Sequence, residues 1–425
     1  MYDLRPSTIW RFFKQQPPSY WLICAYLVLE YVRPQQIYPF LNALPLTSAV
    51  IFLCLGATII EGRFLRKLNV ADGWLALFTL VVLLSSAFAY SPEFAFANLE
   101  LYVSWVLIYA LISLVLRTEQ QLLMFMLIYL LACLKMSQHG FRSWVANGFG
   151  FSSWGVTCAP AWFHNSGECG IQMAMFLPVS LFFAAALWPF LVQWVRLLLA
   201  SMPITAAATI IATSSRGALV GLAGIGIWLV LISKHRIKAV LLATVLASVV
   251  LALTPAEQRT RLNEMGDDGT SVSRLVYWEH AREIIADKPL LGVGYYNWLP
   301  YYRHYYNPNG EMVHNVFYQA TAELGYSGLA AFIGMITATI VLNRRTRQLM
   351  RKRGTQGRFL RGMATGLDGA LIGFLITGSF VTVLFYPFFW INLAMTAALY
   401  TTARKTVCPA RSSRDAARPV VPATA

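Results

Sequence analysis

The chain has 425 residues, of which 57% are apolar and only 12% are charged. Soluble domains carry about 25% charged residues, so this composition excludes an ordinary soluble protein. It also excludes nucleic-acid binding as the meaning of the net charge of +15, because most of the surface must face lipid. The excess of Lys and Arg is typical instead of the cytoplasmic loops of an inner-membrane protein.

Apolar runs of about 20 residues, the length that crosses a bilayer as a helix, recur along the whole chain. They predict an all-α integral membrane protein with about twelve transmembrane helices. The first run lacks a convincing signal-peptide cleavage site and is interpreted as a retained span. We expect the spans at residues 19–38, 43–60, 72–90, 98–116, 120–138, 166–187, 197–213, 217–233, 237–254, 314–342, 364–385 and 387–403.

Most of the 34 Lys and Arg residues fall in the alternate connections of this arrangement. Basic residues gather in cytoplasmic loops, so both termini are predicted to be cytoplasmic in a bacterial inner membrane. The predicted parts are spans one to nine within 1–254 with a periplasmic loop at 139–165, a large periplasmic loop at 255–313, spans ten to twelve within 314–403 with a basic cytoplasmic loop at 343–362, and a disordered cytoplasmic tail at 404–425.

The large periplasmic loop carries two patterns that predict short helices. Aromatic residues from Trp298 to Tyr306 recur at steps of three and four, which favours a helix at the membrane surface. A longer amphipathic helix is expected over 273–287, ended by Pro289. Its apolar face contains Leu275, Trp278, Ala281 and Ile285.

Two arginines stand where helices are expected to begin on the outer face. Arg216 opens the eighth span, and Arg274 opens the amphipathic helix. A helix N-terminus with free N–H groups and a guanidinium fork is a natural phosphate site. The alternative for each arginine is that it extends to the interface or pairs with a loop carboxylate. Ser215, beside Arg216, and Arg142, another outer-face arginine, are assigned to substrate binding with them.

His314 stands where the tenth span leaves the large loop, and Asn315 is positioned to cap that helix. The pKa of histidine suits proton transfer near neutral pH, although a structural interfacial histidine is the alternative. Asp267 and Asp268, flanked by glycines, favour a turn over a metal site, and no cofactor is expected. Other candidate acid–base groups, each also explained by a structural role, are Glu168, Glu311 and Glu323.

Gly292 and Gly294 allow a tight backbone path, and both are assigned to substrate binding. Tyr296 and Trp298 belong to an aromatic group that could stack on sugar rings or form an interfacial belt; both readings stay open. Cys158 and Cys169 both lie on the outer side, where a disulfide is conceivable, and the sequence leaves this open too.

Several of these residues stand in motifs that resemble the O-antigen ligase (WaaL) family, within the superfamily that includes the O-antigen polymerases (Wzy). A separate stretch, Glu30–Gln35, resembles O-glycosylation ligases associated with exosortase systems. The motifs of the first resemblance are Ser214–Gly217, Ser273–Arg274, Lys288–Gly294, His314–Asn315 and Glu323–Gly328.

The resemblance implies a GT-C-type glycosyltransferase fold and a metal- and ATP-independent inverting transfer. A glycan would pass from undecaprenyl diphosphate to the lipid A–core oligosaccharide on the periplasmic face. Arg216 and Arg274 would hold the diphosphate, and His314 would be catalytic. The alternatives are an O-antigen polymerase, an O-glycosylation ligase acting on protein or exopolysaccharide, and, less favoured, a lipid-linked sugar flippase. The oligomeric state is not predicted.

Overall fold

The protein is described by a computed structural model that covers residues 4–63, 65–150, 155–158, 161–163, 165–253 and 269–407. Throughout these ranges the regular structure is helical, without a strand. Seven helices are long and apolar enough to cross a membrane, so the chain is a multi-pass helical membrane protein. They are α5 (Val70–Ala87), α7 (Leu99–Val115) joined to α6 (Pro92–Ala97), α8 (Glu119–Ala146), α9 (Ser166–Leu187), α10 (Gln193–Ala212), α16 (Val316–Arg351) and α17 (Arg358–Gly378).

A helix also occupies each of the other five predicted spans, so twelve spans remain a prediction that is partly supported. Two of them, α4 and α11, are apolar but shorter than the seven above. These five are α2 (Pro18–Tyr31), α4 (Leu46–Ile60), α11 (Arg216–Ile232), α12 (Arg236–Leu253) and α18 (Pro387–Val407). The short helical pieces are α3 (Pro34–Ile37), η1 (Pro39–Leu41), η2 (Ala161–Phe163) and η3 (Trp188–Phe190).

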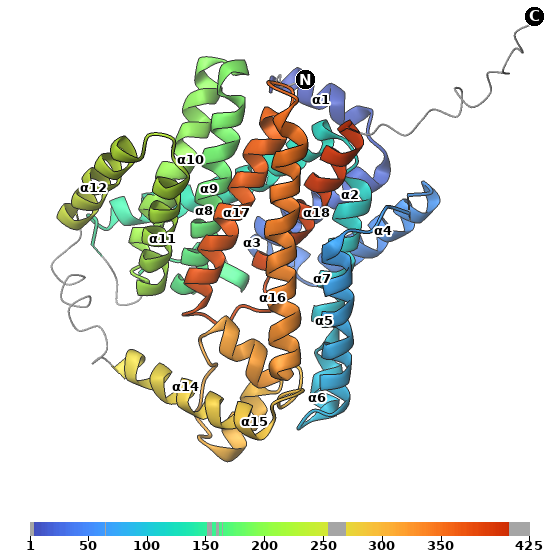
Figure 1. Cartoon of the computed structure of the whole chain (residues 1–425), viewed down its shortest axis with the longest axis vertical. Coiled ribbons are helices and arrows are strands. Elements are labelled where there is room, and N and C mark those ends of the chain that lie inside the picture. The colour runs from blue at the N-terminus through green and yellow to red at the C-terminus, as the bar shows by residue number, and fades with distance from the viewer. Residues whose placement is uncertain are drawn as a thin grey trace, which may run out of the picture.

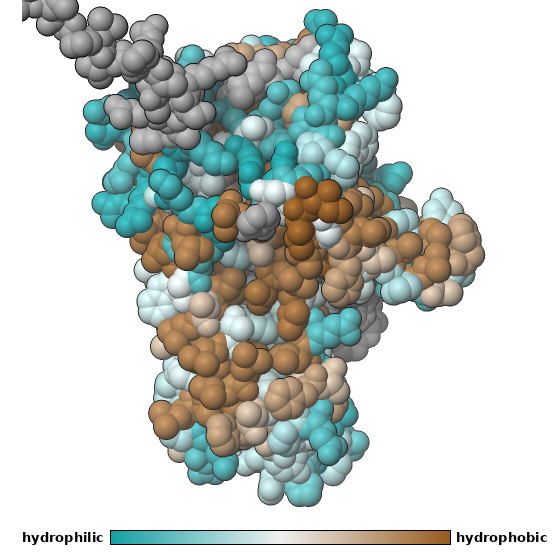
Figure 2. Space-filling view, turned by 90° about the vertical axis from the view of Figure 1, so that its right-hand side faces the viewer, coloured by the Kyte–Doolittle hydropathy of each residue, from teal (hydrophilic) through white to brown (hydrophobic). Residues whose placement is uncertain are grey.

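The molecule has two distinct ends (Figure 1). At one end, which we call the α1 end, α1 (Pro6–Lys14) lies with the turn between α16 and α17. At the opposite end, the α14 end, α14 (Gly269–Asp287) and α15 (Trp298–Tyr305) lie together with α6. Figure 2 shows a broad apolar band between polar ends on one face, the distribution expected of a protein that spans a bilayer.

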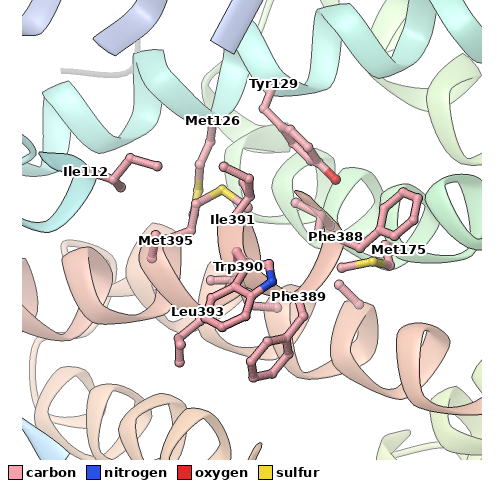
Figure 3. Close-up of a cluster of buried hydrophobic side chains, with 14 of the residues drawn as sticks. Ile112, Met126, Tyr129, Met175, Phe388, Phe389, Trp390, Ile391, Leu393 and Met395 are labelled. Atoms are coloured by element: carbon pink, nitrogen blue, oxygen red, sulfur yellow. The ribbon is translucent and has the colours of Figure 1, made fainter. Parts of the chain in front are cut away.

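Helix α18 lies at the centre of the bundle. Trp390 is fully buried, and its indole Nε1–H donates to the Leu384 carbonyl oxygen at 2.9 Å. Figure 3 shows this helix among apolar side chains of its neighbours. The labelled side chains are Ile112 of α7, Met126 and Tyr129 of α8, Met175 of α9, and Phe388, Phe389, Trp390, Ile391, Leu393 and Met395 of α18.

Helices extend further than the sequence indicated at three connections. Helix α8 continues to Ala146, which shortens the predicted loop at 139–165. Helices α16 and α17 leave only 352–357 of the predicted basic loop, because Lys and Arg are good helix formers. Helix α18 continues to Val407, into the predicted tail; residues 408–425 of that tail lie outside the described part of the chain.

The large loop holds both predicted helices, with one correction. Helix α14 begins at Gly269, so Arg274 lies beyond its first turn and the helix-dipole argument fails for that residue. Leu275 is 55% exposed, whereas Ala281 and Ile285 are buried as expected. The buried residues of this helix, Ala281, Ile284 and Ile285, all lie in its second half, whereas the first half keeps an exposed apolar side chain.

Candidate active site

Arg216 stands in the first turn of α11, as the sequence predicts. Ser215 is the N-cap residue, and its Oγ accepts a hydrogen bond from the Ala218 N–H at 3.4 Å. The Thr213 hydroxyl accepts from the Ser215 N–H at 3.3 Å. Ser214 has a φ of +53°, a conformation that non-glycine residues rarely adopt. This tight turn sets Arg216 at the positive end of the helix.

His314 is held in a constrained conformation just before α16. Its φ is +50°, and such strain costs on the order of 1–3 kcal/mol and persists only where surrounding contacts determine it. The His314 N–H donates to the Thr382 hydroxyl at 2.8 Å. The Asn315 side chain accepts from the N–H groups of Phe317 and Tyr318 at 2.9 and 3.1 Å, which confirms that Asn315 caps this helix.

The electrostatic surroundings of His314 include two groups of opposite sign. Burial lowers the pKa of His314 below its usual value, and the positive charge of Arg274 lowers it further. The Glu311 carboxylate, 3.6 Å from Nε2, acts in the opposite direction. The structure therefore brings Arg274 and His314, 40 positions apart in the sequence, into one site. It favours the neutral imidazole, the form that can accept a proton.

The connection between α17 and α18, residues 379–386, lies between this histidine and Arg216. On one side, Phe380 packs so closely on Gly217 that a Cβ there would lie 2.8 Å from the Phe380 Cβ. Two residues later, Thr382 holds the His314 backbone. We name this connection the 379–386 loop.

The same loop also reaches α16 and α9. The Leu384 N–H donates to the Gln319 side-chain oxygen at 3.0 Å. The Tyr386 hydroxyl donates to a Glu168 carboxylate oxygen at 2.9 Å. Sequence reasoning missed this loop, because most of it was placed inside a span predicted at 364–385. The sequence signal that could have located it was Gly378 followed nine positions later by Pro387, because glycine and proline both interrupt helices.

Two of the sequence motifs, Lys288–Gly294 and Glu323–Gly328, pack against each other. Helix α16 is kinked at Gly325, where φ is +69°, and the Tyr326 N–H donates to the Pro289 carbonyl oxygen at 2.7 Å. A Cβ on Gly325 would lie 2.2 Å from the Leu290 backbone, and one on Gly292 would lie 2.4 Å from the Ala322 carbonyl oxygen. The need for close backbone packing accounts for Gly292; its role in substrate binding stays a prediction.

Gly294 and Trp298 belong to the same packed region. The Gly294 N–H donates to the Glu323 carbonyl oxygen at 3.0 Å, and the Trp298 N–H donates to the Glu323 carboxylate at 3.4 Å. Trp298 is fully buried and donates from Nε1 to the Glu311 carbonyl oxygen. A ring without an exposed face cannot stack on a sugar, so packing explains Trp298 better than the predicted substrate contact.

Tyr296 keeps part of its surface exposed next to this packed region. Its φ is +61°, and its ring lies 6.3 Å from that of Phe94 and 5.7 Å from that of Tyr295. Tyr295 itself is fully buried. Of the predicted aromatic substrate contacts, Tyr296 is therefore the one whose ring a sugar can still reach.

Arg142 is not brought to this site by any contact within the described residues. It is exposed on α8, and its Nε donates to the Gln138 carbonyl oxygen of the same helix at 3.3 Å. Its predicted role in substrate binding receives no support from the geometry.

Cys158 and Cys169 form a disulfide, with their Cα atoms 5.3 Å apart. This settles the pairing that the sequence left open. The bond ties the segment before α9 to the first turn of that helix, the turn that also carries Glu168.

A group of aromatic and charged side chains next to the disulfide was not predicted as part of the site. The Arg33 guanidinium lies 5.6 Å from the Trp162 ring centre and forms an ion pair with Glu30 at 3.2 Å. The Trp162 ring lies 4.6 Å from that of Tyr386, which bonds Glu168. The Glu30–Gln35 stretch, singled out only by resemblance, is thus linked to the 379–386 loop through Trp162.

Within the described ranges, no three His, Cys, Asp or Glu side chains converge in a way that could hold a metal ion. Asp267 and Asp268, the aspartates considered as ligands, lie outside those ranges.

Comparison with known proteins adds one match. Residues 200–333 match the family model described as O-antigen ligase, and no curated protein matches the chain. The matched region begins within α10 and ends within α16, so it contains Arg216, Arg274 and His314. Residues 200–333 of the chain are therefore similar to the O-antigen ligase family.

Proposed function

We propose that the protein is an O-antigen ligase of the inner membrane. It would transfer a glycan from undecaprenyl diphosphate to a hydroxyl of the lipid A–core oligosaccharide at the α14 end, facing the periplasm. The family match supports a ligase- or polymerase-type activity. The observation that carries the choice of site is that Arg274 lies close enough to His314 for its positive charge to lower the histidine pKa.

In this proposal the two arginines act on the leaving group. Negative charge grows on the diphosphate as the glycosidic bond breaks, and guanidinium groups can neutralise it through paired hydrogen bonds. A well-placed donor of this kind is worth about 3–4 kcal/mol in the transition state. Arg216 reaches the site from α11 and Arg274 from α14, so the diphosphate would lie between the bundle and the large loop.

His314 would remove the proton from the attacking hydroxyl. Its depressed pKa keeps the imidazole neutral near pH 7, and general-base catalysis contributes typically 10²–10⁴-fold. The acceptor oxygen attacks the anomeric carbon while the bond to the diphosphate oxygen breaks, so the configuration inverts. The energy of the donor bond drives the transfer, and neither nucleotide nor metal is required.

A reconstituted assay with the full chain tests the activity. The protein receives undecaprenyl-diphosphate-linked glycan with and without lipid A–core, in the presence of EDTA. Glycan on lipid A–core supports the ligase. Longer glycan that remains on the carrier indicates a polymerase, and transfer to protein or exopolysaccharide indicates an O-glycosylation ligase. Activity that EDTA abolishes and a divalent ion restores would contradict the metal-independent mechanism.

We expect His314→Ala to lower transfer by at least about 100-fold, because the general base is lost. The matched control is His304→Ala, since His304 is an exposed histidine of α15 in the same large loop. Both variants should keep the melting temperature of the wild type in detergent. Normal transfer by the His314 variant would overturn the general-base assignment.

A further inference from the structure

Three cations converge at the α1 end, far from the proposed active site. They are Arg63 after α4, Arg117 before α8 and Lys405 in the last turn of α18. The Arg117 Nη2 donates to the Arg63 carbonyl oxygen at 3.0 Å. Burial lowers the pKa of Arg117, and the positive charge of Arg63 lowers it further. Arg63 and Arg117 also repel the Lys405 ammonium.

Glu61, the carboxylate next to these cations, already has an ion pair and hydrogen bonds of its own. One oxygen of Glu61 lies 3.0 Å from the Arg63 Nε, and the carboxylate also accepts from the Ser19 N–H at 2.8 Å and the Ser19 hydroxyl at 2.5 Å. The Arg63 Nη1 is buried and has no hydrogen-bond partner among the described residues. An excess of positive charge with an unused guanidinium donor suits an anion that has several acceptor oxygens.

Helix α1 indicates that this cluster lies at the level of a membrane surface. Phe12 of α1 is buried, whereas Trp10 is 56% exposed and has the Lys14 ammonium 5.4 Å above its ring. Exposed Trp beside Lys is typical of the headgroup region. The helix is tied to the cluster by Gln121, which donates to the Gln16 side chain at 2.8 Å and accepts from the Arg117 N–H at 2.9 Å.

We propose that Arg63, Arg117 and Lys405 bind the phosphate of an anionic phospholipid headgroup. The bound phosphate offsets the repulsion among the three cations and joins the connections that follow α4 and α7 to the end of α18. This lipid site does not depend on the glycosyltransferase activity proposed above.

Native mass spectrometry of the full chain with added phosphatidylglycerol tests the site. Each basic residue near an anionic headgroup is worth about 1 kcal/mol, so Lys405→Gln should weaken lipid binding roughly five-fold. Arg117→Gln should weaken lipid binding by at least the same factor. Lys405 is exposed and donates no hydrogen bond within the described residues, so its variant tests the site even if Arg117→Gln unfolds.

The matched control is Arg196→Gln. Arg196 donates from Nε to the Trp188 carbonyl oxygen at 3.1 Å and stacks on the Trp188 ring, away from the cluster. Phosphatidylglycerol affinity unchanged in Lys405→Gln, or lowered equally in the Arg196 control, would overturn the site. Phosphatidylcholine should not compete. Inorganic phosphate that competes at the same concentration as the lipid would overturn the assignment to a headgroup.

Discussion

At His314, a cation and a carboxylate shift the pKa of the imidazole in opposite directions. Arg274 lowers its pKa and Glu311 raises it, on a background of burial that also lowers it. The chemistry of the residue is thus set by neighbours that the sequence alone does not reveal. The left-handed backbone at His314, Ser214 and Tyr296 shows that three positions near the site are held by contacts rather than by local preference.

The pH dependence of kcat/KM tests the role of His314. On the acid side of this profile, activity falls as His314 of the free enzyme becomes protonated. The midpoint of this acid limb should lie below the ordinary pKa of histidine. Glu311→Gln removes a negative charge that favours the protonated form, so the limb should move to lower pH. Arg274→Gln removes a positive charge that disfavours it, so the limb should move to higher pH.

The Glu311 shift should shrink in added salt, because its side chain is 72% exposed and salt screens exposed charges. Kinetics with purified variants in one buffer series provide the measurement. Shifts of the same sign in both variants would show that another group titrates.

Arg216→Lys tests whether the guanidinium fork matters. Lysine keeps the charge but cannot make the paired hydrogen bonds to a diphosphate, so we expect transfer to fall by about 10–100-fold. The control is Arg303→Lys, because Arg303 is exposed on α15 and donates to the Gly310 carbonyl oxygen at 3.1 Å. Full activity of the Arg216 variant would place the diphosphate elsewhere.

At the scale of elements, two connections position the site. The segment at 288–294 packs into the kink of α16, and the 379–386 loop joins α9, α11 and α16. Glu323 supports the first by accepting the Trp298 N–H, and Gln319 supports the second by accepting the Leu384 N–H. Because Gln319 also donates to Glu323 at 3.4 Å, the two connections share one buried hydrogen-bonded pair on α16.

Gly325→Ala should disturb this arrangement. The new Cβ would lie 2.2 Å from the Leu290 backbone, at a φ of +69°. We expect a loss of about 2 kcal/mol of stability, in the range of strained or overpacked substitutions, together with reduced transfer. The control is Gly226→Ala in α11, where a Cβ would meet nothing within 4 Å. Thermal unfolding in detergent compares the two; equal melting temperatures would contradict the packing argument.

At the scale of the whole molecule, the polar ends and apolar band suggest how the chain crosses the membrane, and the basic α1 end is expected to face the cytoplasm. A labelling experiment in intact cells tests this. In a Cys408→Ser background, Asn309→Cys should react with an impermeant maleimide, whereas Lys352→Cys should react only after lysis. The reverse pattern would mean that the proposed active site faces the cytoplasm.

Local patterns were sufficient for most helices. Hydrophobic runs located a helix at every predicted span, and capping chemistry located the start of α16 at Asn315, because these features depend on neighbours in the chain. Where a helix ends was predicted less well. Helix α16 continues to Arg351 and α14 starts at Gly269, because charged and small residues permit a helix without demanding one.

The amino-acid sequence, read alone, was enough for the membrane class, the approximate helices and the candidates Arg216, Arg274 and His314. Tertiary structure decided which of them meet. Arg274 lies close enough to His314 to lower its pKa, Arg142 makes no contact with this site within the described residues, and Trp298 is buried. The 379–386 loop, its hydrogen bond to Glu168 and the Arg33–Trp162 contact were revealed only by the tertiary structure. The physical reason is that helix formation depends on nearby residues, whereas these contacts join distant positions, from 40 residues apart for Arg274 and His314 to 218 for Glu168 and Tyr386, and no local pattern records such pairing.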